Sequence, residues 1–159
     1  MAAEGSAGER KQRPITAMLR LPTVPVPGEK PYLVGYRCSA CGATYVGEGR
    51  IGCSKCMATE PPQEIRLSDR GSLYVYSIVH QSVPGVPVPY VSAIVDLLEG
   101  VSVRCNLVDI EPDPAKITFG MPVEMVTRKV RERKEKNPEG VEETIDIIAF
   151  FFKPSQNER

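Results

Sequence analysis

Long hydrophobic runs are missing from this sequence of 159 residues. The longest uninterrupted apolar stretches have only a few residues, such as residues 147–152 (IIAFFF), whereas a membrane-spanning helix needs about 20. The N-terminal stretch MAAEGSAGERKQR also lacks the apolar segment of a secretory signal. We therefore expect a soluble, cytoplasmic protein that has no membrane partner.

Neither sign of charge is in excess, because 20 Lys and Arg residues balance 20 Asp and Glu residues. Proteins that bind nucleic acid in general draw much of their affinity from basic side chains placed on phosphates. The balanced charge does not exclude a local basic patch, but it makes nucleic acid an unfavoured partner.

Catalytic motifs are absent as well. The sequence contains no G-x-S-x-G nucleophile elbow, no P-loop and no H-E-x-x-H zinc-protease motif, and its single histidine is His80. Cys105 lies inside an apolar stretch (VSVRCNLV), where a free thiol usually packs as a small hydrophobic group. A dyad of Cys105 with His80 is the less favoured alternative. We predict no catalytic residues and expect that the chain is not an enzyme on its own.

Proline is abundant, with 15 residues against 13 glycines. Proline lacks a backbone donor and fixes φ, so long helices are not expected over most of the chain. Residues 1–31 are predicted to be a disordered tail followed by a proline-rich arm, because the first 14 or so are small and charged. A short helical turn can form at residues 15–21. The prolines that follow impose an extended arm (Pro22, Pro25, Pro27 and Pro31).

Five segments rich in β-branched and aromatic residues follow the cysteines and predict strands. They are residues 72–80, 90–98, 101–108, 121–133 and 144–152. Glu99-Gly100 predicts a tight hairpin between the second and third strands. Five strands with a longer third connection match an OB-fold barrel, although the strand count also permits an SH3-like barrel or a small sandwich. The predicted barrel spans residues 63–154, and residues 155–159 form a tail.

Four of the five cysteines form two C-x-x-C pairs separated by eleven residues, within a predicted ribbon at residues 32–62. In a cytosolic protein such pairs indicate metal ligands rather than disulfides. Four thiolates complete a tetrahedral zinc site and leave no open position, so we predict one structural zinc ion per chain. A rubredoxin-type iron site is the main alternative. The predicted ligands are Cys38, Cys41, Cys53 and Cys56. The predicted fold is therefore mainly β, an N-terminal rubredoxin-like zinc ribbon followed by a five-stranded OB-fold barrel.

Three further segments suggest surfaces. Residues 128–136 hold a basic cluster diluted by two glutamates, which usually marks a solvated strand edge. A contact of this cluster with phosphates is the less favoured interpretation. Residues 83–89 (VPGVPVP) and 21–31 are stiff and apolar, and stiff segments lose little entropy on docking. They suit a protein interface.

The ordered set of motifs resembles the zinc-ribbon/OB-fold acyl-CoA-associated family, long catalogued as a domain of unknown function. The resemblance covers about residues 32–153. It rests on the two cysteine pairs, Ser68–Tyr76, Pro89–Leu97, Glu99–Val101 and Phe119–Val123. The chain departs from the family pattern in its second knuckle, where Ser54 and Met57 replace the usual proline and trailing glycine. It also carries a proline-rich arm where the family has an N-terminal helix pair.

The resemblance implies an accessory subunit, non-catalytic or co-catalytic, of a thiolase-type complex acting on acyl-CoA. The implied partner is a thiolase-superfamily protein, which carries the catalytic Cys and His in a hetero-oligomer. One member of the family is the small subunit of benzoylsuccinyl-CoA thiolase, and the layout of this chain suits such a subunit. The resemblance also implies a coenzyme A thioester contact, for which basic residues near the ribbon–barrel junction are the candidates (Arg37, Lys55, Arg66 and Arg70).

Two other functions stay open from the sequence. Zinc ribbons and OB-folds also serve as single-stranded nucleic-acid modules, in which Tyr74 and Tyr76, expected on one face of their strand, would stack on bases. A small stand-alone enzyme would use Cys105 as its nucleophile.

Overall fold

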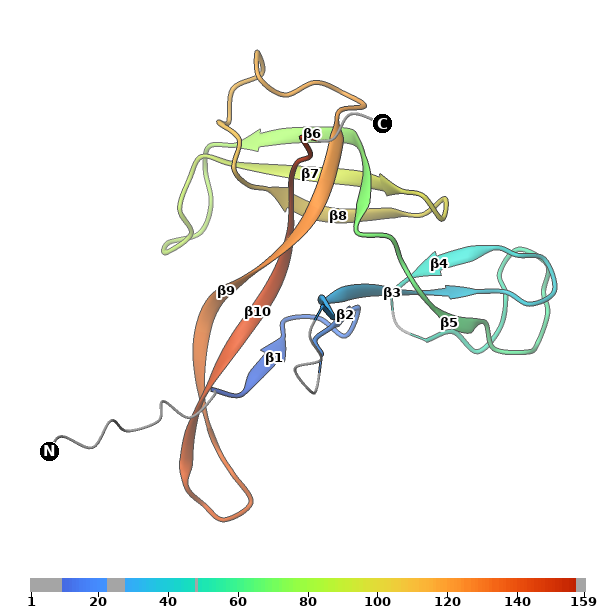
Figure 1. The fold of residues 1–159 in the computed structure, drawn as a ribbon, viewed down its shortest axis with the longest axis horizontal. Helices are drawn as coiled ribbons and strands as arrows, with labels where there is room; N and C mark the ends of the chain where they lie inside the picture. The colour runs from blue at the N-terminus through green and yellow to red at the C-terminus, as the bar shows by residue number, and fades with distance from the viewer. Residues whose placement is uncertain (1–9, 23–27, 48, 157–159) are drawn as a thin grey trace, which may run out of the picture.

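The computed structural model describes residues 10–22, 28–47 and 49–156, which form ten β-strands in two sheets. The described residues contain no helix that is long and apolar enough to cross a membrane. Figure 1 shows three parts: a barrel, a small ribbon beside it, and a two-stranded arm that projects from the barrel.

Five strands form the barrel: β6 (Arg70–Val79), β7 (Tyr90–Leu97), β8 (Ser102–Leu107), β9 (Pro122–Lys136) and β10 (Glu142–Pro154). Their order is β6-β7-β8-β10-β9, and the ring closes because β9 also pairs with β6. Only the β10–β8 contact is parallel within this ring. The predicted mainly-β fold with an OB-fold barrel is confirmed, and the SH3-like and sandwich alternatives are set aside.

The barrel forms because its strands alternate between apolar and polar residues. In β7 every second residue is buried (Val91, Ala93, Val95 and Leu97), which is the period of a strand with one face on a core. Gly71 allows β6 to approach β7 closely. A Cβ atom at that position would overlap the carbonyl oxygen of Asp96.

All five predicted barrel strands are present, with ends that differ by a few residues from the prediction. The hairpin between β7 and β8 is one residue longer than predicted. Leu97 N–H donates to the carbonyl oxygen of Val101 at 2.8 Å, so three residues form the loop rather than two. Gly100 supplies the positive φ of 78° that this type of loop requires.

The ribbon consists of β3 (Tyr32–Arg37) between β4 (Thr44–Val46) and β5 (Gln63–Arg66). β2 (Leu19–Arg20) pairs with the start of β3. Leu19, Leu33 and Leu67 are buried and belong to the same hydrophobic cluster as the barrel residues. The ribbon and the barrel therefore share one core.

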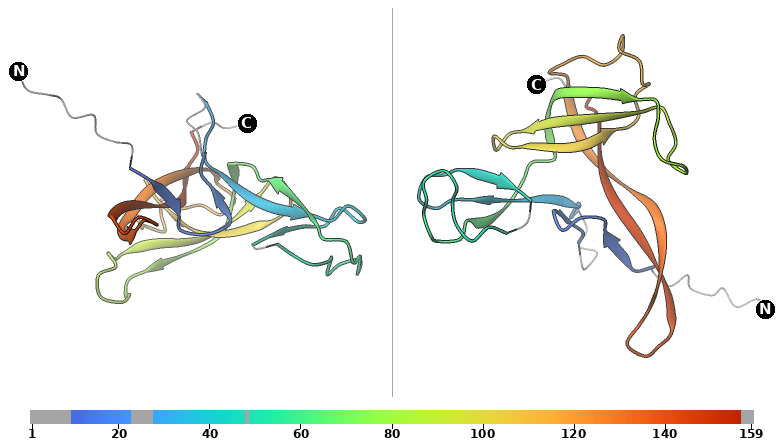
Figure 2. Two further views of the ribbon diagram at one scale, coloured as in Figure 1. Left: turned by 90° about the horizontal axis from the view of Figure 1, so that it is seen from below. Right: turned by 180° about the vertical axis from the view of Figure 1, so that it is seen from behind.

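The arm is the part of β9 and β10 that continues beyond the barrel, and it contacts a strand from the N-terminal segment. β1 (Gln12–Pro14) pairs in parallel with Asp146–Ile148 of β10. The right-hand view in Figure 2 shows β1 beside β10, on the side away from β9. Four ion pairs join this segment to the arm: Arg10 with Glu132 at 2.8 Å and with Asp146 at 3.8 Å, Lys11 with Glu143 at 2.6 Å, and Arg13 with Glu135 at 2.7 Å.

These contacts correct the prediction for the N-terminal segment. Within residues 1–31, the structure places two short strands where a disordered tail, a helical turn and an arm were predicted. Residues 15–18 form bends and a turn rather than a helix. The strands form because β10 and β3 offer open edges, a tertiary effect that the polar local sequence does not show. Residues 1–9 and 23–27 lie outside the described residues.

Candidate metal centre

The two cysteine pairs lie in two matching turns of the ribbon. In the first turn, Gly42 N–H donates to the Cys38 carbonyl and Cys38 N–H donates to the Ala43 carbonyl, both at 2.9 Å. The second turn repeats this pattern, with Met57 donating to Cys53 at 3.0 Å and Cys53 donating to Ala58 at 2.9 Å. Each turn folds the backbone around its first cysteine and directs both of its thiols to the same point.

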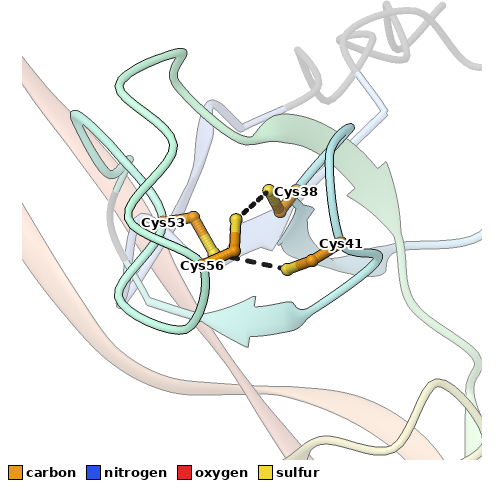
Figure 3. Close-up of side chains that lie close together, drawn as sticks. All are labelled: Cys38, Cys41, Cys53 and Cys56. Atoms are coloured by element: carbon orange, nitrogen blue, oxygen red, sulfur yellow. Dashed lines mark hydrogen bonds between the residues drawn. The ribbon is translucent and has the colours of Figure 1, made fainter.

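The four sulfur atoms form one compact group, and Figure 3 shows the side chains pointing toward one another. Their Sγ atoms all lie within 4.8 Å, with 3.7 Å between Cys38 and Cys56 and 3.6 Å between Cys41 and Cys53. Four sulfurs held about 2.3 Å from a tetrahedral zinc ion would be roughly 3.8 Å apart. The geometry is compatible with zinc, and four protein ligands would leave no position for water or substrate.

Tyr45 on β4 contacts this group and was not singled out from the sequence. Its hydroxyl lies 3.1 Å from Cys53 Sγ and accepts a hydrogen bond from Ser54 Oγ at 3.3 Å. The guanidinium of Arg50 covers the Tyr45 ring at 4.2 Å from its centroid. A tyrosine on a ribbon strand between two cysteine turns is the only sequence signal for this contact.

The hydrogen bond from Tyr45 is the largest cause that lowers the pKa of Cys53 to about 5, followed by a backbone N–H of Cys56. The pKa of Cys56 rises to about 12. The backbone N–H of Ala58 lowers this pKa, but the neighbouring sulfurs and burial disfavour a second charge and raise it further than that. Adjacent thiols cannot all ionise without a cation between them. The site is therefore suited to a divalent metal that neutralises several thiolates.

The Cys105–His80 alternative receives no support from the structure. Cys105 is buried in β8, and burial raises the pKa of its thiol to about 12. His80 is exposed just beyond the end of β6, and no hydrogen bond joins it to Cys105 within the described residues. Cys105 is a core residue.

The four basic residues suggested for coenzyme A do not gather in one place. Arg66 lines a hollow of about 320 Å³ at the ribbon–barrel junction, where it stacks on Tyr32 at 4.4 Å. Arg70 lines a separate hollow of about 400 Å³ beside Leu98. Arg37 and Lys55 line neither hollow and lie exposed in the ribbon.

The junction hollow also contains carboxylates, which would repel a phosphate. Glu99 from the β7–β8 loop lines it and accepts hydrogen bonds from Ser68 N–H at 2.8 Å and Ser68 Oγ at 3.0 Å. Asp69 lines the same hollow. These contacts tie the linker between ribbon and barrel to the barrel, so a structural role accounts for Glu99 and Ser68.

The surface that nucleic-acid-binding OB-folds use carries few basic and aromatic residues in this chain. On the outer face of β7 and β8, Arg104 is the one basic residue and Tyr90 the one aromatic residue. The two tyrosines of β6 do not share a face, because a β-bulge between Leu73 and Val75 changes the alternation. Tyr74 is exposed, whereas Tyr76 packs on the core and on Phe119, with ring centroids 5.4 Å apart.

We expect Met57→Gly to stabilise the ribbon. Met57 has a φ of 62° and occupies the position that Gly42, with a φ of 73°, occupies in the first turn. A left-handed conformation costs a non-glycine residue about 1–2 kcal/mol, partly offset because glycine gains freedom in the unfolded chain. The net gain should be about 0.5–1 kcal/mol in the free energy of unfolding, measured by denaturant titration of the metal-loaded chain.

Gly42→Ala is the matched control for that substitution. No heavy atom lies within 4 Å of a Cβ added at Gly42, so any loss of stability would come from the backbone conformation alone. A destabilising Met57→Gly would show instead that the Met57 side chain, which is 79% exposed, contributes to the fold.

Tyr45→Phe should weaken zinc binding by about tenfold at pH 7, as expected for loss of a hydrogen bond to a ligand. Without the hydroxyl, the pKa of Cys53 rises. The wild-type Cys53 thiol has already lost its proton near neutral pH, whereas the variant thiol still carries it and must release it when the metal binds. The logarithm of zinc affinity, measured by chelator competition between pH 6 and pH 8, should therefore rise more steeply with pH. An unchanged slope would show that Tyr45 does not control this thiol.

Comparison with known proteins places the chain in a family. The profile described as "ChsH2, C-terminal OB-fold domain" matches residues 64–128. A "DUF35 domain-containing scaffold protein" of Methanocaldococcus jannaschii is 37% identical over 81% of this chain and 86% of its own length. A "Benzoylsuccinyl-CoA thiolase subunit BbsA" of Geobacter metallireducens is 37% identical over 82% of this chain and 80% of its own length.

A solved structure agrees with these relatives. The structure described as "Ltp2-ChsH2(DUF35) aldolase" contains a chain that is 31% identical, with a TM-score of 0.54. The similarity covers 77% of this chain and 84% of that one, and so extends well beyond the 64–128 segment matched by the profile. The chain belongs to the DUF35 family of zinc-ribbon/OB-fold proteins associated with acyl-CoA thiolases.

Proposed function

We propose that this chain is an accessory scaffold subunit of a thiolase-type complex that acts on acyl-CoA. Its partner would be a thiolase-superfamily protein that carries the catalytic residues. Relatives named as scaffold proteins and as thiolase subunits support this proposal, because their similarity extends over about four fifths of both chains.

The observation that carries the proposal is the exposure of large apolar side chains on both the ribbon and the barrel. Ile51 on the ribbon is 93% exposed, and Leu98 in the β7–β8 loop is 81% exposed. The loop between β6 and β7 exposes Val83, Val86 and Val88 on a proline-rich backbone. Exposed apolar groups that are held on a rigid frame commonly mark protein-binding surfaces.

The cysteine group supports a structural role for the metal in this subunit. We propose zinc at Cys38, Cys41, Cys53 and Cys56, which the compact sulfur geometry favours. Zinc bound by four thiolates would stabilise the two turns and provide no Lewis-acid site. The ribbon would then present Ile51 and Met57, which both flank the second turn, in a fixed arrangement.

For coenzyme A, the geometry favours a contact shared with the partner over a site on this chain alone. The basic residues considered from the sequence are divided between two hollows and the ribbon. The carboxylates beside Arg66 oppose a phosphate. We propose that acyl-CoA is bound mainly by the catalytic partner.

The proposal predicts a stable hetero-oligomer. The chain should be co-expressed with a thiolase-superfamily protein from the same genome, and the mass and zinc content of the purified species measured. We expect one complex that contains both chains, with one zinc ion for each copy of this chain.

Leu98→Asp provides the interface test, because Leu98 is almost fully exposed and its replacement should leave the barrel intact. Ser77→Asp, at an exposed position of β6, is the matched control. If the wild-type chain remains alone beside that partner, the proposal is wrong, and binding to single-stranded oligonucleotides becomes the next function to measure.

A further inference from the structure

The arm of β9 and β10 has one occupied edge and one open edge. β1 pairs with β10 along one side. On the other side, β6 pairs with β9 only at Pro122–Glu124. From residue 127 to residue 136, no strand of the described residues pairs with that side of β9. Figure 1 shows this edge facing away from the rest of the molecule.

The open edge presents backbone groups that can bind another strand. Met125 N–H points away from β10, because it donates to the Asp69 carbonyl oxygen at 2.7 Å. Alternate residues of an antiparallel strand point their N–H and C=O groups in the same direction. Thr127 therefore also directs its N–H away from β10, whereas Val126 between them directs its N–H toward β10.

The same segment carries a strong positive charge. Residues 128–136 contain six basic residues and two glutamates, in a chain with no net charge. Both glutamates form ion pairs with the N-terminal segment, Glu132 with Arg10 and Glu135 with Arg13. Among the described residues, no ion pair neutralises Arg131, Lys134 or Lys136. Within the strand, Glu132 also pairs with Lys129, and Glu135 with Arg133. Each of the two glutamates is therefore shared among several basic groups, and the basic residues of this stretch remain in excess.

We propose that the edge of β9 from residue 127 to residue 136 binds an extended, acidic segment of the partner protein by strand addition. This inference rests on the proposed function, since the partner is the thiolase-superfamily protein of that complex. Main-chain hydrogen bonds would provide affinity, and the basic side chains would select for acidic residues. Val130, which is 43% exposed, is the extra residue of a β-bulge opposite Ile147 and Ile148, so the added strand would pair with β9 on either side of it.

The charges also decide against other occupants. Two copies of this edge would bring like charges together, which opposes pairing of the chain with itself. Single-stranded nucleic acid requires aromatic side chains for stacking, and residues 127–136 include none. An acidic polypeptide would complement the basic side chains and pair with the open backbone groups of β9.

Hydrogen exchange in the complex tests the proposal without any substitution. The amide of Thr127 should exchange at least tenfold more slowly in the complex with the thiolase-superfamily partner than in the free chain. The amide of Val126 already faces β10 and should change little, so it is the internal control. Unchanged exchange at Thr127 in a formed complex would overturn strand addition.

Substitutions test the main-chain hydrogen bonds and the basic side chains separately. Thr127→Pro removes the outward N–H while leaving the β10 hydrogen bonds, and Thr127→Val retains it. Arg131→Glu combined with Lys134→Glu reverses the charge, and Arg104→Glu on β8 is the control. Thr127→Pro and the double variant should each weaken binding to the partner at least tenfold. The melting temperature and zinc content of each free variant chain would show that it folds. The two controls should bind like the wild type.

The outcomes separate this inference from the proposed function. If the wild-type chain forms no complex with the partner, the proposed function fails and the strand-addition site fails with it. If a complex forms and both edge variants bind as tightly as their controls, only the strand-addition site is wrong. If the charge variant alone weakens binding and Thr127 gains no protection, the contact is made by side chains and strand addition is likewise wrong.

Discussion

The packing of Leu33 and Leu67 into the barrel core is the interaction on which the arrangement of this protein depends. Both residues belong to the ribbon and its linker, yet they lie in one hydrophobic cluster with barrel residues such as Leu73 and Val95. Fully burying a leucine side chain contributes about 2–3 kcal/mol. This packing, together with the Glu99–Ser68 hydrogen bonds, fixes the cysteine turns relative to the barrel and makes one frame from two small modules.

The ribbon itself has little core of its own. Apart from residues that pack on the barrel, its buried side chains are few: Val34, Pro62, Cys38 and Cys53. Modules of this size usually require a metal or disulfides to fold. Metal binding at the four thiols would supply that stability and hold the exposed Ile51 in place. The frame would then offer binding surfaces rather than a reaction site.

Features with strong local signals were predicted correctly from the sequence. The β-branched and aromatic composition located the five barrel strands, and the C-x-x-C spacing identified four residues whose sulfurs the fold brings within 4.8 Å. β1 was missed because its three residues (Gln12, Arg13 and Pro14) have no strand pattern, and it forms through an open edge of β10 and through ion pairs. The bulge in β6 was also invisible, so Tyr74 and Tyr76 were wrongly placed on one face. Tyr45 was overlooked because its contact with Cys53 depends on the folded ribbon.

The central claim is that this chain contributes structure and binding surfaces while its partner performs the chemistry. The most direct measurement is the thiolysis rate of the purified complex in which this chain carries both His80→Ala and Cys105→Ala, compared with the wild-type complex of equal mass and zinc content. The account predicts equal turnover numbers for the two complexes, and no thiolysis by this chain alone. A large fall in turnover for the variant complex, or activity of the isolated chain, would contradict it.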